Sequence, residues 1–187
     1  MSLFDKLKRQ AVETIQDGIK TAANKSVTVP IQAIPATLAE FTALPQAALA
    51  TPFDTAALTV VALCVYPYNK EASLQMLNYL RGPRPLSNQE QSFLADRFRD
   101  SDYVPRSYFS GATADNDYEP QAPYSIIVSE GPYSYQNEGY AKLYICSGGA
   151  DHPREVLLRQ AKDGKWYLWD QMLLVGIRQP ESANPWA

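Results

Sequence analysis

The loop at residues 147–154 groups the residue types from which an acid–base site is built. It reads SGGADHPR and places His152, the only histidine of the chain, directly after Asp151, with Arg154 two residues further on. An imidazole that a carboxylate orients is the basic unit of general acid–base catalysis. Together with Arg106, which lies elsewhere in the chain, these residues are the candidate catalytic groups of a small hydrolase or transferase.

The same loop is a candidate for contact with a ligand or a partner. Gly148 and Gly149 allow backbone conformations that bring amide groups close to a bound molecule, and Ser147 precedes them. A simpler interpretation is structural, because a histidine in a turn is more often a surface or capping residue, and Asp151 can cap its own turn. We favour this structural role over catalysis.

A second loop, at residues 115–119, has the alternating carboxylates with which a calcium-binding loop begins. Asp115, Asp117 and Glu119 have this spacing. However, Pro120 stands where such a loop requires a glycine, and no bidentate glutamate follows at the right distance. We therefore favour a solvated acidic loop over a metal site, and we expect neither a metal nor another cofactor.

Aromatic side chains are concentrated between residues 103 and 144. On the solvated face or rim of a sheet, such residues can form a contact surface, although they are equally ordinary as half-buried strand residues. The members that we interpret as candidates for contact with a ligand or partner are Tyr108, Tyr133 and Tyr135.

The composition of the 187-residue chain restricts its class. A hydrophobic content of 45% can fill a core, and a formal net charge of −3 gives no general attraction to nucleic acid. Cys64 and Cys146 form no CxxC pattern, and the chain has a single histidine that could complete a zinc site with them. We therefore expect reduced structural thiols rather than zinc ligands. The N-terminus lacks the apolar run of a secretory signal, and we expect a cytoplasmic protein.

Two N-terminal segments differ from the rest of the chain. In residues 1–25, apolar positions at helical spacing predict an amphipathic helix that lies on a membrane surface, contacts a partner or packs on its own domain. Its small basic excess argues against the membrane. Residues 26–50 are rich in proline, alanine and threonine, which predicts a linker or an extended arm over the domain, with a single short helix at residues 36–43.

Residues 51–180 carry the elements of a single α+β domain, and residues 181–187 form a tail. Asp54 is the expected cap of a uniformly apolar and therefore buried helix that ends near Tyr66, with a buried strand as the alternative. Asn69 is the expected cap of a second helix, which continues through residue 80.

A third helix begins at a capping box at residues 87–90, where a serine precedes a glutamate by three positions. It should bury Phe93, Leu94 and Phe98. Beyond about residue 100 the apolar period changes to two, which predicts strands at residues 123–129 and 139–146 and a hairpin after them. The fold is therefore α+β, with N-terminal helices packed on one face of a C-terminal antiparallel meander sheet of about four strands.

The turn of the last hairpin has two possible forms. Asp163 and Gly164 can be the central pair of a tight type I′ turn. Alternatively, Lys162 and Asp163 form a type I turn, and Gly164 is the left-handed residue of a bulge. The two forms differ in register by one residue, which exchanges the faces of every side chain.

The bulged form pairs Leu158 with Leu168 and Leu157 with Trp169, whereas the tight form sets Leu157 against Asp170. We favour the bulged form because apolar cross-strand pairs stabilise a sheet. We expect Leu158 and Trp169 to be buried, so that replacing either by alanine destabilises the domain strongly.

The C-terminal two thirds of the chain resemble a known family. The strings that carry the likeness are RSYFSGAT at 106–113, PYSY at 132–135, GYAKLY at 139–144, SGGADHPR at 147–154 and WYLWDQMLLVGIRQP at 166–180. Together they resemble an uncharacterised bacterial family of domains of unknown function, over about residues 51–180. The resemblance implies a bacterial intracellular domain with an added N-terminal extension, and it supplies no activity, cofactor or catalytic residue.

We therefore favour a non-enzymatic binding or scaffold module whose partner is an unknown protein or small molecule. The alternatives are an enzyme that uses the loop at 147–154 with Arg106, and a protein that associates with a membrane surface through its N-terminal helix. An enzyme should collect its catalytic groups in a concave pocket, whereas a module leaves them scattered. The sequence leaves the oligomeric state open.

Overall fold

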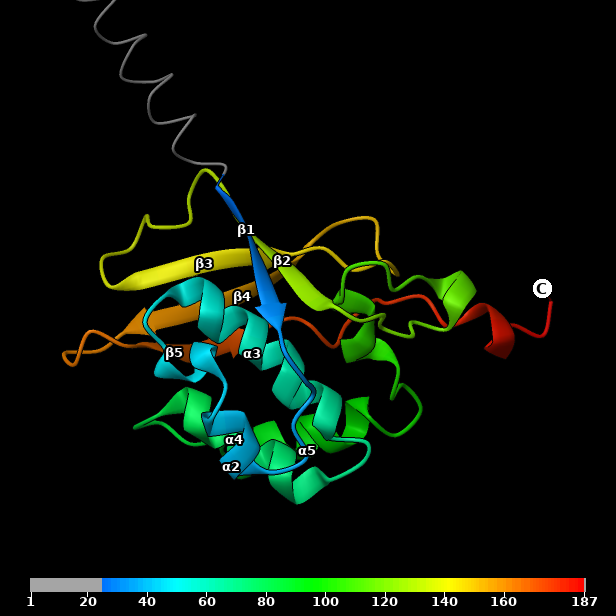
Figure 1. The fold of residues 1–187 in the computed structure, drawn as a ribbon, viewed down its shortest axis with the longest axis horizontal. Coiled ribbons are helices and arrows are strands. Elements are labelled where there is room, and N and C mark those ends of the chain that lie inside the picture. The colour runs from blue at the N-terminus through cyan, green and yellow to red at the C-terminus, as the bar shows by residue number, and fades with distance from the viewer. Residues whose placement is uncertain (1–24, 187) are drawn as a thin grey trace, which may run out of the picture.

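An antiparallel sheet forms one layer of the fold and helices form the other (Figure 1). The computed structural model describes residues 25–186, so the helix predicted for residues 1–25 lies outside the described residues except for Lys25. The five strands lie side by side in chain order: β1 (Ser26–Ile31), β2 (Tyr124–Glu130), β3 (Tyr140–Ile145), β4 (Arg154–Gln160) and β5 (Trp166–Gln171). This arrangement confirms the α+β class and the meander.

The sheet has five strands instead of about four because residues 26–31 form an additional edge strand, β1. The carbonyl of Lys25 accepts a hydrogen bond from Glu130 N, so the odd-numbered residues of β1 form the hydrogen-bonded pairs with β2. Pro30 therefore lies at a position whose missing N–H would point away from β2, which is where an edge strand tolerates proline. Val29 and Ile31 are buried in the core.

The rest of the segment interpreted as a linker or arm also packs in the domain. It forms α2 (Leu38–Thr42) and the short 3₁₀ helix η1 (Pro45–Ala48), and Phe41 and Leu49 are fully buried. Tyr79 Oη donates a hydrogen bond of 2.7 Å to the carbonyl of Ala47. Residues 26–50 therefore contribute to the same core as the later helices.

Helix α3 (Pro52–Val65) is the centre of the core. It contacts all five strands, and its residues from Thr55 onward are buried, as expected for an element that is apolar on every side (Figure 1). The strand alternative is therefore wrong. The N-cap is Thr51 rather than Asp54, because Thr51 Oγ1 accepts from the amide of Asp54 and donates to its carboxylate.

Two further helices follow with the predicted caps. Asn69 caps α4 (Lys70–Arg81), and the capping box caps α5 (Asn88–Arg97). Leu94 is buried, but Phe93 is 40% exposed, so the prediction that Phe93 lies on the inner face is wrong. Three 3₁₀ helices complete the fold: η2 (Val104–Tyr108), η3 (Ala114–Asn116) and η4 (Glu181–Ala183). Among residues 25–186, no helix has both the length and the apolar character that crossing a membrane requires.

The β4–β5 hairpin has the favoured turn and a second irregularity. Gly164 has φ +82° and Leu158 pairs with Leu168, which confirms the bulged turn. A further register shift between Leu157 and Leu158 then leaves Trp169 without a partner and sets Leu157 against Asp170. The predicted pairing of Leu157 with Trp169 is therefore wrong, because a second bulge adds one residue to β5.

Candidate functional site

The glycines of the loop at 147–154 serve close backbone packing. A Cβ on Gly148 would lie 1.9 Å from the carbonyl oxygen of Ala112, and a Cβ on Gly149 would lie 2.3 Å from the hydroxyl of Tyr118. Gly148 N donates to Ser107 O, and Gly149 N donates to Ser147 Oγ. The amides that we interpret as candidates for ligand contact therefore already have partners within the domain.

Arg154 connects this loop to the segment that follows β5. Its Nε donates to Val175 O at 2.8 Å, Nη2 donates to Gly176 O at 2.8 Å, and Nη1 donates to His152 O at 2.7 Å. A guanidinium has five N–H donors and no acceptor, so three carbonyl partners use most of its capacity. Arg154 thereby holds two loops together.

Asp151 pairs with Arg178 at the surface and not with His152. Arg178 Nη1 lies 2.8 Å from Asp151 Oδ1, and both side chains are exposed. The hydrogen bond and the positive charge of Arg178 lower the pKa of the Asp151 carboxyl. Arg106 is directed elsewhere, since its Nη1 donates to Tyr68 Oη at 3.2 Å. The structure therefore does not assemble the four candidate catalytic residues into a hydrogen-bonded set.

The three candidate contact tyrosines separate into two environments. Tyr108 is buried, and its hydroxyl donates to Leu173 O at 2.6 Å. Burial raises the pKa of the Tyr108 hydroxyl. Tyr133 and Tyr135 are exposed in the connection between β2 and β3, and the Tyr135 hydroxyl donates to Glu130 Oε1 at 2.7 Å.

The acidic loop has a structural role at Asp117. This residue has the left-handed conformation, with φ 54°, and its carboxylate accepts a hydrogen bond from Ser182 N at 3.4 Å. The loop is thereby tied to the C-terminal segment that contains η4. Among residues 25–186, no group of three or more histidine, cysteine, aspartate or glutamate side chains is arranged to hold a metal ion.

A cavity of about 280 Å³ lies where the end of α4 meets the β4–β5 hairpin. Its wall contains four cationic side chains and no carboxylate. The cationic members are Arg81, Arg84, Arg159 and Lys162. Tyr167, Leu168 and Trp169 supply the apolar part of the wall. A mostly apolar cavity with a few convergent polar groups is the usual form of a small-molecule site.

Two guanidinium groups lie over the indole ring of Trp169. The Cζ atoms of Arg84 and Arg159 are 4.5 Å and 4.9 Å from the ring centroid, and the Tyr140 ring packs edge-on at 5.7 Å. The side chain of Trp169 is half-buried, so its predicted burial in the core is wrong. The alternation of β5 explains the difference, because successive side chains of a strand point to opposite faces and Leu168 already faces the core.

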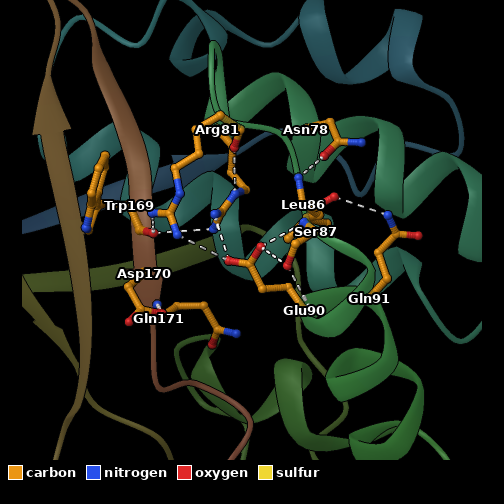
Figure 2. Close-up of polar contacts among 10 residues, drawn as sticks. Asn78, Arg81, Leu86, Ser87, Glu90, Gln91, Trp169, Asp170 and Gln171 are labelled. Carbon is orange, nitrogen blue, oxygen red and sulfur yellow. Dashed lines mark hydrogen bonds and ion pairs between the residues drawn. The ribbon is translucent and has the colours of Figure 1, made fainter.

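A network around Arg81 fixes the wall of the cavity (Figure 2). Arg81 is 4% exposed, and its Nη2 contacts Glu90 Oε1 at 2.7 Å. Its Nη1 and the Nη1 of Arg84 each donate to the carbonyl of Trp169 at 3.3 Å. Glu90 also accepts from the backbone and hydroxyl of Ser87. The end of α4, the start of α5 and strand β5 are joined by this one cluster.

Partial burial alone would raise the pKa of Glu90, but the hydrogen bonds from Ser87 and the charges of Arg81 and Arg84 outweigh it. The net effect lowers the pKa below 4.5, the ordinary value for glutamate. A lowered pKa contributes stability above the ordinary value, and that stability is lost as the pH falls through the pKa of the folded state.

Glu90→Gln is therefore expected to reduce the free energy of unfolding by about 1–2 kcal/mol at pH 7, because it removes charge-assisted hydrogen bonds. The difference from the unsubstituted protein should shrink as the pH is lowered below 4.5. Urea unfolding at a series of pH values measures both effects. Glu138→Gln, at an exposed glutamate outside the network, is the control and should change little. An equal loss at all pH values would contradict the role of the charge.

Sequence reasoning selects none of the cavity's cationic residues. Arg81 and Arg84 flank the end of a helix, Arg159 lies just before a turn and Lys162 lies in that turn; these are ordinary positions for charged residues. Only the sheet register and the packing of α4 on β5 bring the two pairs to one cavity. The basic residues around both turns are a signal in the sequence, but nothing local indicates that they meet.

The fold and the site define a class: an α+β domain with helices on one face of an antiparallel meander and a cationic cavity beside its last hairpin. A family model described as a domain of unknown function (DUF6935) matches residues 33–181, and the chain belongs to this family. The match begins before residue 51 and so includes α2 and η1, which pack in the core. Neither a curated protein nor a solved structure matches the chain.

Proposed function

We propose that this domain is a non-enzymatic binding module and that its ligand is an anion held in the cavity beside the β4–β5 hairpin. The observation that carries the proposal is the cavity wall, with four cationic side chains and no carboxylate. Because the whole chain has a formal net charge of −3, this local excess of positive charge is a feature of the site and not of the protein surface in general. We place the protein in the bacterial cytoplasm as part of the same proposal.

The contacts of the loop at 147–154 support binding over catalysis. Arg154 donates to three backbone carbonyls, and Asp151 pairs with Arg178. Catalysis by His152 would require an orienting carboxylate within hydrogen-bond reach of its ring. Asp151, the neighbouring carboxylate, contacts Arg178 instead.

The proposal is tested by NMR titration of the full chain with phosphate, sulfate and citrate at constant ionic strength. We expect saturable shifts of backbone amides at residues 81–84 and 159–162 with at least one of these anions. A diamine at the same concentrations serves as the cationic control and should leave those amides unchanged. Shifts confined to residues 147–154, or no saturable shift with any anion, would overturn the proposal.

A further inference from the structure

We infer that the cavity recognises a phosphate group, either as inorganic phosphate or as the phosphate ester of a small metabolite. This inference rests on the proposed function and names the chemical class of its ligand. Three observations support it: three of the four cationic side chains are available to a ligand, they come from separate parts of the fold, and aromatic rings hold two of them in place.

Three of the four cationic side chains are available to a ligand. Arg81 is held by Glu90 at 2.7 Å and by the carbonyl of Trp169. Arg84 shares the same partners but lies farther from Glu90 Oε1, at 3.7 Å, while its distance to the carbonyl is the same 3.3 Å; its side chain is about half exposed. In the part of the chain that the structure describes, neither Arg159 nor Lys162 forms a hydrogen bond or ion pair through its side chain, and both are exposed.

These three groups come from separate parts of the fold. Arg84 follows the end of α4, Arg159 lies near the end of β4, and Lys162 lies in the turn before β5. A carboxylate carries one charge on two coplanar oxygens, and a single bidentate arginine satisfies it. A phosphate monoester carries about 1.5–2 negative charges at pH 7 on three acceptor oxygens, so it can use donors that approach from several directions. Three cations from three elements match the second ligand better.

Arg84 and Arg159 are also held in place before any ligand arrives. The indole of Trp169 lies within 5 Å of both guanidinium carbons, and Arg159 also lies 5.2 Å from the Tyr140 ring centroid. Contacts of this kind restrict long side chains while leaving guanidinium N–H groups able to donate. A restricted side chain loses less conformational freedom on binding, which increases affinity.

The size of the cavity favours a small ligand. Its volume of about 280 Å³ lies just below the range of roughly 300–1,000 Å³ that is common for drug-sized ligands. The apolar wall formed by Tyr167, Leu168 and Trp169 leaves room for a short organic group beside the phosphate. We therefore expect a phosphate monoester of a few carbon atoms to bind at least as tightly as inorganic phosphate.

The test is isothermal titration calorimetry of the full chain with inorganic phosphate, glycerol phosphate and succinate, at constant ionic strength set by chloride. We expect both phosphates to bind and to change the intrinsic tryptophan fluorescence of the chain, because the ring of Trp169 contacts Arg84 and Arg159. Arg159→Gln and Lys162→Gln should each weaken phosphate binding about tenfold, the effect of losing roughly 1.4 kcal/mol.

Two matched variants control for charge alone. Lys165→Gln removes a lysine from the same hairpin but outside the cavity wall, and Arg97→Gln removes an arginine that lies 5.0 Å over the ring of Phe93. Both should bind phosphate as the unsubstituted chain does. Circular dichroism melts establish that all four variants fold, which the exposed positions of the four residues favour.

The outcomes separate this inference from the proposed function. Phosphate binding that Arg159→Gln and Lys162→Gln weaken, and that the two controls do not, supports it. If succinate binds through the cavity and phosphate does not, the phosphate inference is overturned while the anion-binding function remains. If phosphate binds equally to all variants, the cavity is not its site and the inference falls. If no anion binds, the inference and the proposed function both fall.

Discussion

Gly148→Ala is expected to lower the free energy of unfolding by about 3 kcal/mol, a value near the upper end for an overpacked site. The added Cβ would lie 1.9 Å from the carbonyl oxygen of Ala112 and 3.0 Å from its carbonyl carbon. Both atoms belong to the backbone, so no side-chain rotation relieves the overlap. The loop at 147–154 and the segment around Ala112 must therefore move apart, which disturbs the hydrogen bond from Gly148 N to Ser107 O.

The matched control for this substitution is Gly139→Ala. Gly139 has φ +74°, and no atom lies within 4 Å of the position that its Cβ would occupy. Alanine there therefore costs only left-handed backbone strain, about 1–2 kcal/mol. Urea unfolding of both variants compares the two penalties directly. If Gly148→Ala costs no more than Gly139→Ala, the close approach of the two loops is not a feature of the native domain.

Leu158→Ala is expected to lower the free energy of unfolding by about 3 kcal/mol, as for other buried leucines. Leu158 is fully buried between the sheet and the helical layer, and it pairs with Leu168 across the hairpin. The alanine variant loses the free energy gained when the leucine side chain moves from water into the core, and it leaves a cavity in a well-packed region.

The neighbouring residue provides the control, since successive side chains of a strand point to opposite faces. Leu157 is only half-buried, and Leu157→Ala should cost about 1 kcal/mol. Thermal and urea unfolding of the two variants report the difference. Equal losses would mean that the faces of β4 are assigned incorrectly.

Features that depend on a few neighbouring residues can be predicted from the sequence. The capping box at Ser87 and Glu90 and the cap at Asn69 are of this kind, because each is encoded within three or four positions. The bulged turn at Gly164 also requires the pairing of Leu158 with Leu168 across the hairpin. Strand β1 escapes prediction because its partner β2 lies about a hundred residues away, and because Pro30 suggests a linker. Only the pairing shows that Pro30 faces the free edge.

The candidate site is harder to predict because it also depends on contacts between residues that are far apart in the sequence. The paired glycines after Ser147 suggest exposed amides, whereas their small size is required by Ala112 and Tyr118, which are remote in sequence. The cationic cavity depends on the packing of α4 beside β5, which brings together two pairs of basic residues that are remote in sequence. Tertiary packing determines both the role of the glycines and the position of the cavity. The residues near each feature in the sequence do not indicate that packing.

The partners of the outward backbone groups on the two outer strands, β1 and β5, affect whether strands of other molecules can add to the sheet. Strand β5 has its Trp166 N–H bonded to Leu49 O and its Trp166 carbonyl bonded to Thr55, while arginines cover the carbonyl of Trp169. At the other edge, Pro30 offers no N–H, and Gln46 Nε2 donates to its carbonyl at 2.6 Å. Edge strands with free N–H and C=O groups are templates for cross-β growth. Each edge of this sheet therefore has part of its outward backbone blocked, which works against such polymerisation, and the arginines that line the cavity block part of the β5 edge.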